Sequence, residues 1–196
     1  MTPLGGSWVT AKVSVYYHVG SWDAFTGTAD DGKPVCGIGS TNPVDSRSLS
    51  IRLEIGNDTL QFQARKPTWK IPADTPIPVV VQIGFEPPWN MQGTGDGQMV
   101  QWMLDSDSMR TFDVQFRRAS SMTLNFPAGS EPPWTVGLNG STAVSNAFGR
   151  CVRDLAQPKQ TQPAPAGPTQ PFGQTPPDLT PSVPFAPLPS APPRTP

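Results

Sequence analysis

Hydrophobic and polar residues alternate along several stretches of this chain. Residues 9–19 carry Val, Ala or Tyr at every second position, separated by Thr, Lys, Ser, Tyr and His. Residues 49–55 and 60–65 repeat the alternation on either side of a Gly-Asn-Asp turn. A period of two is typical of a strand that buries one face and exposes the other. The first third of the chain therefore predicts antiparallel strands joined by short turns.

Other strands are predicted from short apolar runs that end at turn residues. Residues 22–28 and 35–38 flank an Asp-Asp-Gly turn, where glycine allows the positive φ that a tight hairpin needs. The Gly-rich residues 92–97 are interpreted as a loop that connects two later strands. These later strands are expected at residues 69–71, 78–85, 98–104, 122–126 and 134–138.

Helical spacing appears in the last part of the domain. Apolar residues three and four positions apart across residues 109–119 follow an Asp-Ser-Asp sequence that can cap a helix. A strand over the same residues is the alternative. Residues 141–155 carry one apolar stripe, and Ser141 is expected to be the N-cap of this helix. The stripe places Cys151 on the buried face of the helix.

The composition of the chain changes sharply after Gln157. Fourteen of the 26 prolines lie in residues 158–196, a segment that has too few apolar residues to offset its ordering entropy. The sequence therefore predicts one globular domain over residues 7–156 and a disordered proline-rich tail over residues 157–196. We interpret the tail as a spacer with polyproline II bias, in which Phe172 and Phe185 would contact any docking partner.

The charge of the chain narrows the classes of partner. Lys and Arg number 14 and Asp and Glu number 15, so the net charge is −1 at pH 7. Neither nucleic acid nor an anionic membrane is expected as a partner, because both require a basic surface. No apolar run approaches the ~18 residues of a membrane span, so no transmembrane segment is expected. A protein or a component of the cell envelope is the expected partner.

The two cysteines, Cys36 and Cys151, lie 115 positions apart beside predicted elements. Buried free thiols are one interpretation, because a cysteine behaves as a small hydrophobe. A long-range disulfide is favoured, since it would close a loop of roughly 100 residues and stabilise the fold by about 4–5 kcal/mol. A disulfide implies export, yet residues 1–20 show no basic segment followed by an apolar one. A leader upstream of residue 1, a misplaced start and a reduced cytosolic protein all remain as explanations.

A Glu-Pro-Pro-Trp motif occurs twice, at residues 86–89 and 131–134. Proline ends strand ladders and large aromatic side chains seal cores. The favoured interpretation is therefore a pair of strand-ending turns in which each tryptophan folds back over the core. In the alternative interpretation Trp89 and Trp134 are exposed aromatic edges that bind a ligand.

The usual catalytic and metal-binding patterns are missing from the sequence. The single histidine, His18, is on the polar face of a strand and no Gly-x-Ser-x-Gly motif accompanies it. One histidine and two distant cysteines do not make a zinc site. No catalytic residue, metal ligand or cofactor is therefore assigned. A carboxylate-dependent hydrolase of carbohydrate or peptide is an alternative, with candidate carboxylates at Asp23, Asp30, Asp31, Asp105 and Asp107.

The second half of the domain has a recurrent spacing of aromatic, aliphatic and small residues, made by Phe112, Phe116, Ala119, Met122, Leu124, Phe126, Trp134, Leu138, Gly140, Ser141, Phe148 and Cys151. This pattern resembles the C-terminal half of small exported proteobacterial proteins related to the invasion-associated locus B family. Residues 22–36, with Asp-Gly ahead of Cys36, are similar to the Trp-and-Cys strand pair that opens those proteins. The resemblance implies an exported, non-enzymatic, β-rich module of the envelope, and it supplies no catalytic residue.

These patterns predict an α+β, mostly β domain, in which an antiparallel sheet or sandwich is closed by the C-terminal helix. The expected function is a non-catalytic binding or structural module of the bacterial cell envelope, periplasmic or secreted, with the tail as spacer or docking segment. The alternatives are the hydrolase and a cytosolic adaptor that acts through its proline-rich tail.

Overall fold

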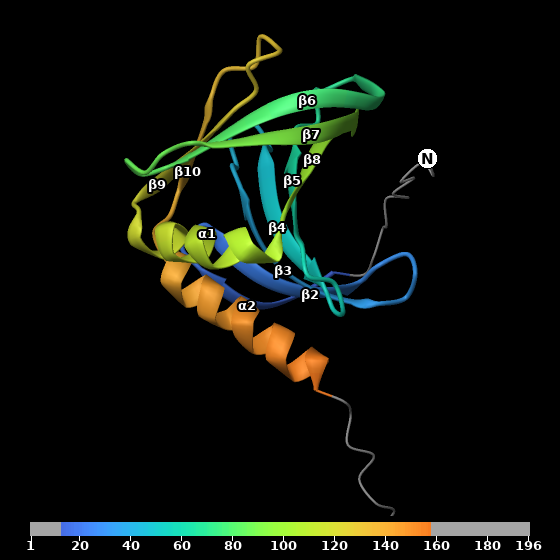
Figure 1. The fold of residues 1–196 in the computed structure, drawn as a ribbon, viewed down its shortest axis with the longest axis vertical. Helices are drawn as coiled ribbons and strands as arrows, with labels where there is room; N and C mark the ends of the chain where they lie inside the picture. The colour runs from blue at the N-terminus through green and yellow to red at the C-terminus, as the bar shows by residue number, and fades with distance from the viewer. Residues whose placement is uncertain (1–12, 158–196) are drawn as a thin grey trace, which may run out of the picture. The chain divides into compact units, whose positions relative to one another are not determined.

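A computed structural model describes residues 13–157 of the chain (Figure 1). Residues 7–12 of the expected domain and the tail from residue 158, including Phe172 and Phe185, lie outside the described residues. The strands are β1 (Ser14–Val19), β2 (Trp22–Thr28), β3 (Pro34–Thr41), β4 (Ser48–Glu54), β5 (Leu60–Arg65), β6 (Ile71–Ile83), β7 (Trp89–Gly97), β8 (Met99–Leu104), β9 (Ser121–Asn125) and β10 (Trp134–Gly137). The helices are α1 (Ser106–Arg118) and α2 (Ser141–Ala156).

The strands form a single antiparallel sheet within residues 13–157, in the order β1-β2-β3-β4-β5-β8-β7-β6-β9-β10. Figure 1 shows that the sheet curls, so that β6 and β7 lie across from β2 and β3, with α1 between them. The mostly β, α+β class is confirmed, and the described strands make one curled sheet instead of the two sheets of a sandwich. No helix in the described part of the chain is both long and apolar enough to cross a bilayer.

The predicted loop at residues 92–97 is wrong, because this stretch belongs to β7. Two of its glycines are required by close packing. A Cβ on Gly93 would lie 2.8 Å from the carbonyl oxygen of Gln101, and a Cβ on Gly95 would lie 2.6 Å from Ile71 and Ile77. The glycines therefore mark places within a strand where neighbouring side chains and backbone come too close for a Cβ.

Strand β6 joins two segments that the sequence predicted separately. Its first part contains Pro72, Pro76 and Pro78 and pairs with β7, whereas its pairing with β9 begins at Val80. One side of the proline-containing part is thus free of ladder hydrogen bonds, which is where proline is tolerated in a strand. The register shifts near Asp74, whose φ is 57°.

The predicted burial of the first strand is wrong at its beginning. Val15 is 56% exposed, although the alternation placed it on the buried face. The register of β1 against β2 shifts between Val15 and Tyr17. Such a bulge turns the preceding side chains to the other face of the sheet.

Helix α1 confirms the helical interpretation of residues 109–119. The Asp105 carboxylate accepts a hydrogen bond of 2.8 Å from the amide of Ser108, which caps the first turn. Its buried side chains fill the concave face of the sheet. The Phe112 ring meets Phe62 edge-on at 5.0 Å, and the Phe116 ring meets Trp22 edge-on at 5.1 Å.

Helix α2 covers the sheet beside β1, β2 and β3 and is joined to it covalently. A disulfide connects Cys36 of β3 with Cys151 of α2, whose Cα atoms lie 6.0 Å apart. The Tyr16 hydroxyl donates a hydrogen bond of 2.9 Å to the carbonyl of Ala147. The structure contains the disulfide that the sequence favoured, and this bridge holds α2 against the first three strands.

The disulfide makes a prediction about stability. Cys36→Ser and Cys151→Ser should each lower the free energy of unfolding by about 2–5 kcal/mol, because each releases the same long loop. The double variant should lose little more than either single variant, since both remove one bond. Urea denaturation of the four proteins under non-reducing conditions measures this cycle. Additive losses would show that the two thiols act independently.

Candidate functional site

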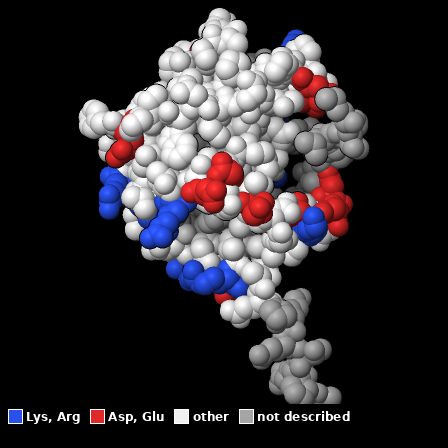
Figure 2. Space-filling model, in the orientation of Figure 1, with Lys and Arg blue, Asp and Glu red and all other residues white. Residues whose placement is uncertain are grey.

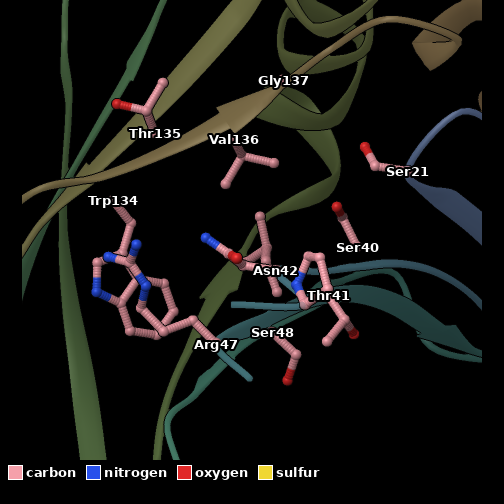
Figure 3. A pocket seen from close by; sticks show the side chains of 12 residues that line it. Ser21, Ser40, Thr41, Asn42, Arg47, Ser48, Trp134, Thr135, Val136 and Gly137 are labelled. Carbon is pink, nitrogen blue, oxygen red and sulfur yellow. The ribbon is translucent and has the colours of Figure 1, made fainter. Parts of the chain in front are cut away.

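A polar groove of about 190 Å³ lies between the edge strand β10 and the turn that connects β3 and β4 (Figure 3). One wall is the whole of β10, and the opposite wall is built from the end of β3, the turn and the start of β4. Ser21, from the turn between β1 and β2, also lines the groove. The lining residues are Ser21, Ser40, Thr41, Asn42, Pro43, Arg47, Ser48, Leu49, Trp134, Thr135, Val136 and Gly137.

The wall formed by β10 presents backbone groups to the groove. Residues of an antiparallel strand bond alternately to one side and to the other. The amide of Leu138 bonds to Ser120 at 2.9 Å, so Val136 and Trp134 also bond toward β9 in this register. The N–H and C=O groups of Thr135 and Gly137 therefore point away from β9. The Gly137 carbonyl accepts a hydrogen bond of 2.9 Å from the indole of Trp22. The N–H and C=O of Thr135 and the N–H of Gly137 are therefore the backbone groups that can bond to a ligand.

The opposite wall is a turn held in shape by its own hydrogen bonds. The amide of Asn42 donates to the carbonyl of Arg47 at 2.8 Å, and the amide of Val44 donates to the Asn42 side chain at 2.9 Å. Figure 3 shows Asn42 reaching across toward Trp134 and Val136. The hydroxyls of Ser40, Thr41 and Ser48 have no hydrogen-bond partner among residues 13–157, so they can serve a ligand.

One end of the groove carries a cation stacked on an aromatic ring. The guanidinium carbon of Arg47 lies 5.3 Å from the centre of the Trp134 ring, within the range of a cation–π contact. The Nε atom of Arg47 lies 2.5 Å from a carboxylate oxygen of Asp45. Arg47 is thus held on both sides, and its position is defined before any ligand arrives.

The Trp134 ring is itself positioned by a partly buried carboxylate, that of Glu131. The Trp134 indole donates to Glu131 at 2.8 Å, the Trp69 indole donates at 3.0 Å, and the Lys66 ammonium donates to both carboxylate oxygens at 2.9 Å. The rings of Trp69 and Trp134 stack at 5.1 Å, with Phe126 edge-on to both. These donors and the stacking with Trp69 fix the Trp134 ring at one end of the groove.

The charge of Glu131 is stabilised by these contacts. Burial alone would raise the pKa of Glu131, but the hydrogen bonds from Lys66, Trp134 and Trp69 outweigh it and lower the pKa below its ordinary value of 4.5. The carboxylate is therefore ionised near neutral pH. An ionised acceptor binds indole N–H groups more strongly than a neutral one, which strengthens the support under Trp134.

Glu131, Lys66, Trp69, Trp134 and Phe126 together form the Glu131 cluster. A second, more apolar hollow of about 340 Å³ borders this cluster. Trp69, Glu131 and Phe126 line it together with Ile71 and Ile77 of β6. The Glu131 cluster therefore contributes residues to two separate concave surfaces.

The structure separates the two tryptophans of the repeated motif. Trp134 is 3% exposed and lines the groove at its Arg47 end. Trp89 is half-buried at the start of β7, and its indole donates to the Gln115 side chain of α1 at 2.7 Å. Both tryptophans fold back over the core, as the favoured interpretation predicted. Phe172 and Phe185 lie outside the described residues.

The candidate carboxylates of the hydrolase alternative lie in three places. Asp23 of β2 contacts His18 at 2.7 Å, Asp30 and Asp31 lie in the turn between β2 and β3, and Asp105 and Asp107 lie at the start of α1. Asp31 pairs with Lys33, and Asp105 caps α1. Within residues 13–157, no group of three or more His, Cys, Asp and Glu side chains could hold a metal ion.

The sequence patterns missed Arg47, which lines the groove, and the residues that support the Trp134 ring. Glu131, Lys66, Trp69 and Arg47 come from three connections that are distant in the chain. The repeated Glu-Pro-Pro-Trp motif was a signal for Glu131, because it placed a carboxylate three residues before a tryptophan. Nothing in the sequence paired this carboxylate with Lys66 and Trp69.

Comparison with solved structures gives a weak similarity of fold. The chain resembles the crystal structure of invasion associated protein B from Bartonella henselae with a TM-score of 0.46 and 16% sequence identity. The alignment covers 71% of this chain and 99% of that one. No protein-family model matches the sequence, and no curated protein is similar to it in sequence.

The Glu131 cluster makes a prediction about stability and pH. Glu131→Gln should lower the free energy of unfolding at pH 7 by about 2–3 kcal/mol, because it removes a charged acceptor from three donors. A lowered pKa contributes stability above the ordinary value of 4.5 that is lost as the pH falls through the folded value. The gap between the wild type and the variant should therefore close below about pH 4.5. Denaturant titrations from pH 7 to pH 3 measure this gap.

Glu86→Gln is the matched control, because Glu86 occupies the same place in the first Glu-Pro-Pro-Trp motif and is exposed. It should change stability by less than about 0.5 kcal/mol at pH 7. Equal losses in the two variants, or a gap that does not change with pH, would contradict the role given to Glu131.

Proposed function

We propose that this protein is a non-catalytic binding module of the bacterial cell envelope, periplasmic or secreted, which holds an extended segment of a partner protein along β10. The observation that carries the proposal is the edge of β10, whose Thr135 and Gly137 backbone groups face the polar groove. Adding a strand to such an edge is a common way to bind a peptide.

The groove supports a short segment in an extended conformation. A donor and an acceptor on Thr135 and a donor on Gly137 match the backbone of two or three peptide residues. Pro132 and Pro133 precede β10 and limit the ladder at that end. Side chains of the bound segment would then alternate between the Arg47–Trp134 end and the hydroxyls of the opposite wall, which provides selectivity.

The chemistry of the groove favours binding over catalysis. Among the described residues that line it there is no histidine, cysteine, aspartate or glutamate. A groove of this composition has no general base to activate a hydroxyl or a water. The serine and threonine hydroxyls are therefore assigned to hydrogen bonding with the ligand.

The disulfide supports the proposed compartment. Disulfides persist in oxidising compartments, such as the periplasm and the extracellular space, and are rare in the cytosol. The bacterial assignment rests on the resemblance of residues 22–151 to exported proteobacterial proteins. In this proposal the proline-rich tail keeps the role expected from its composition, as a spacer or docking segment.

The proposed binding mode predicts the effect of a proline at the edge. Thr135→Pro removes an amide that points away from β9, so it should leave the sheet intact and abolish peptide binding. A displayed library of random 12-residue peptides, selected on the wild-type protein, supplies the probes. Enriched peptides should lose at least tenfold in affinity for Thr135→Pro in fluorescence anisotropy.

Thr135→Val is the control, because it changes the side chain and keeps the amide. It should retain peptide affinity within about threefold, and both variants should unfold within about 1 kcal/mol of the wild type. The proposal fails if the selection enriches no peptide, or if enriched peptides bind Thr135→Pro as well as the wild type.

The proposed compartment predicts the state of the cysteines in the native cell. Protein isolated under denaturing conditions with a thiol-alkylating reagent should carry no label on Cys36 or Cys151, and both should be labelled after reduction. Intact mass spectrometry distinguishes these states and also reads the true N-terminus. Two labelled thiols without reduction would exclude the oxidising compartment and favour the cytosolic adaptor.

A further inference from the structure

The sheet sets the direction in which a bound segment runs along β10. Each pairing between the described strands is antiparallel, so a strand added at the β10 edge is expected to be antiparallel to β10. The residue of the segment opposite Thr135 then exchanges both backbone hydrogen bonds with it, and an earlier residue of the segment lies opposite Gly137. The segment therefore runs from the Gly137 end of the groove toward the Trp134 end.

The backbone pairing of such a segment ends beside Trp134. Every second residue of β10 turns its backbone groups toward the groove, so the position before Thr135 that would do so is occupied by Pro133. Proline has no N–H to donate, and β10 itself begins only at Trp134. The residue of the segment opposite Trp134 is therefore the last one that β10 supports.

The cation at this end of the groove is Arg47. Its guanidinium lies over the Trp134 ring and lines the groove, and its side chain is 20% exposed. The Asp45 carboxylate contacts the Nε atom, whereas the two Nη groups have no hydrogen-bond partner in the described part of the chain. Two Nη groups in one plane can donate to both oxygens of a single carboxylate. Arg47 therefore has the free donors that a negatively charged group needs.

Asn42 adds a second donor beside Arg47. The oxygen of its side chain accepts a hydrogen bond of 2.9 Å from the Val44 amide, so the NH₂ group is the part that can bind a ligand. The Asn42 amide donates to the Arg47 carbonyl at 2.8 Å, which holds the two residues side by side at the base of the turn. Figure 3 shows the amide end of Asn42 directed toward Trp134 and Val136. The donors of both residues thus border the same end of the groove.

The attraction for a negative group is local to this end of the groove. The residues described as lining the groove include Arg47 and no aspartate or glutamate. Figure 2 shows basic side chains gathered over the end of α1 and along α2, whereas acidic side chains lie over the start of α1. The net charge of the chain is −1, so its overall charge does not draw acidic ligands. A single, well-placed negative group on the ligand is what the groove can select.

We infer that the groove binds the C-terminal segment of its partner and holds the terminal carboxylate with Arg47 and Asn42. The inference rests on the proposed function, because it names the part of the partner that lies along β10. The last residue of the segment lies opposite Trp134, where the backbone pairing ends, and its carboxylate meets the Nη groups of Arg47. A chain that continued would lose its backbone pairing at Pro133 and leave those Nη groups without an acceptor.

Amidation of a bound peptide tests the inference on the unaltered protein. Random 12-residue peptides displayed with free C-termini are selected on the full chain, and enriched peptides are synthesised as free acids and as C-terminal amides. With a fluorophore at the N-terminus, the acid should bind at least tenfold more tightly than the amide in fluorescence anisotropy, because amidation removes a charged acceptor. Equal affinity of the two forms would overturn the inference.

One variant and one control assign the carboxylate to Arg47. Arg47→Met should bind the acid and the amide with the same affinity, since the guanidinium is the group that distinguishes the two forms. Arg110→Met removes an exposed arginine of α1 that does not line the groove, and it should keep the tenfold difference. The acid and the amide are compared within each variant, so a change in stability affects both equally. A tenfold difference that persists in Arg47→Met would contradict the assignment.

Thr135→Pro separates this inference from the proposed function. If Thr135→Pro abolishes binding and amidation has no effect on the wild type, strand addition stands and the C-terminal carboxylate is removed. Enriched peptides that share an internal Asp or Glu, and bind equally as acid and amide, would likewise replace the terminal carboxylate with an acidic side chain. Peptides that bind Thr135→Pro as tightly as the wild type would overturn both the inference and the proposed function.

Discussion

The described structure depends on the contacts of one side chain, Trp22. It is fully buried, its ring packs edge-on against Phe116 of α1 at 5.1 Å, and its indole donates to the Gly137 carbonyl of β10 at 2.9 Å. These contacts join the second strand of the sheet to the first helix and to the last strand. The hydrogen bond to Gly137 holds β10 close to the first strands, at the place where the groove lies beside the β3–β4 turn. An indole suits the position because it combines a large apolar ring with one directed donor.

One short segment, residues 134–142, lines two concave surfaces, the proposed groove and a hollow at the start of α2. Its first four residues form the wall of the groove, and residues 138–142 border the hollow at the start of α2. Glu131, just before the segment, holds Trp134, and Gly140 packs closely against Val19. The segment is therefore fixed at both ends by contacts with distant parts of the chain. Binding sites built on such supported backbone lose little conformational entropy when they take a ligand.

Sequence patterns predicted most of the strands and both helices, because their side-chain periodicity reflects local geometry. The patterns failed where packing gave a residue a different role. Gly93 and Gly95 were predicted to lie in a loop but belong to β7. Glycine is needed there because neighbouring atoms leave no room for a Cβ. Ser141 was predicted to be the N-cap of α2 but is its first helical residue. Gly140 is the N-cap instead, with a positive φ that the sequence pattern did not reveal. Val15 changed face through a bulge, which no alternation pattern records.

The sequence by itself indicated the mostly β class, the approximate place of the helices and the disulfide that the two cysteines form, and it offered no recognisable catalytic motif. These follow from local propensity, from composition and from a cysteine count. Only the tertiary structure decided which groups face one another. It placed Lys66 and Trp69 on Glu131, Arg47 over Trp134, and the backbone of Thr135 toward a groove. Such contacts join residues tens of positions apart, and they arise from the curl of the sheet, which no local pattern encodes.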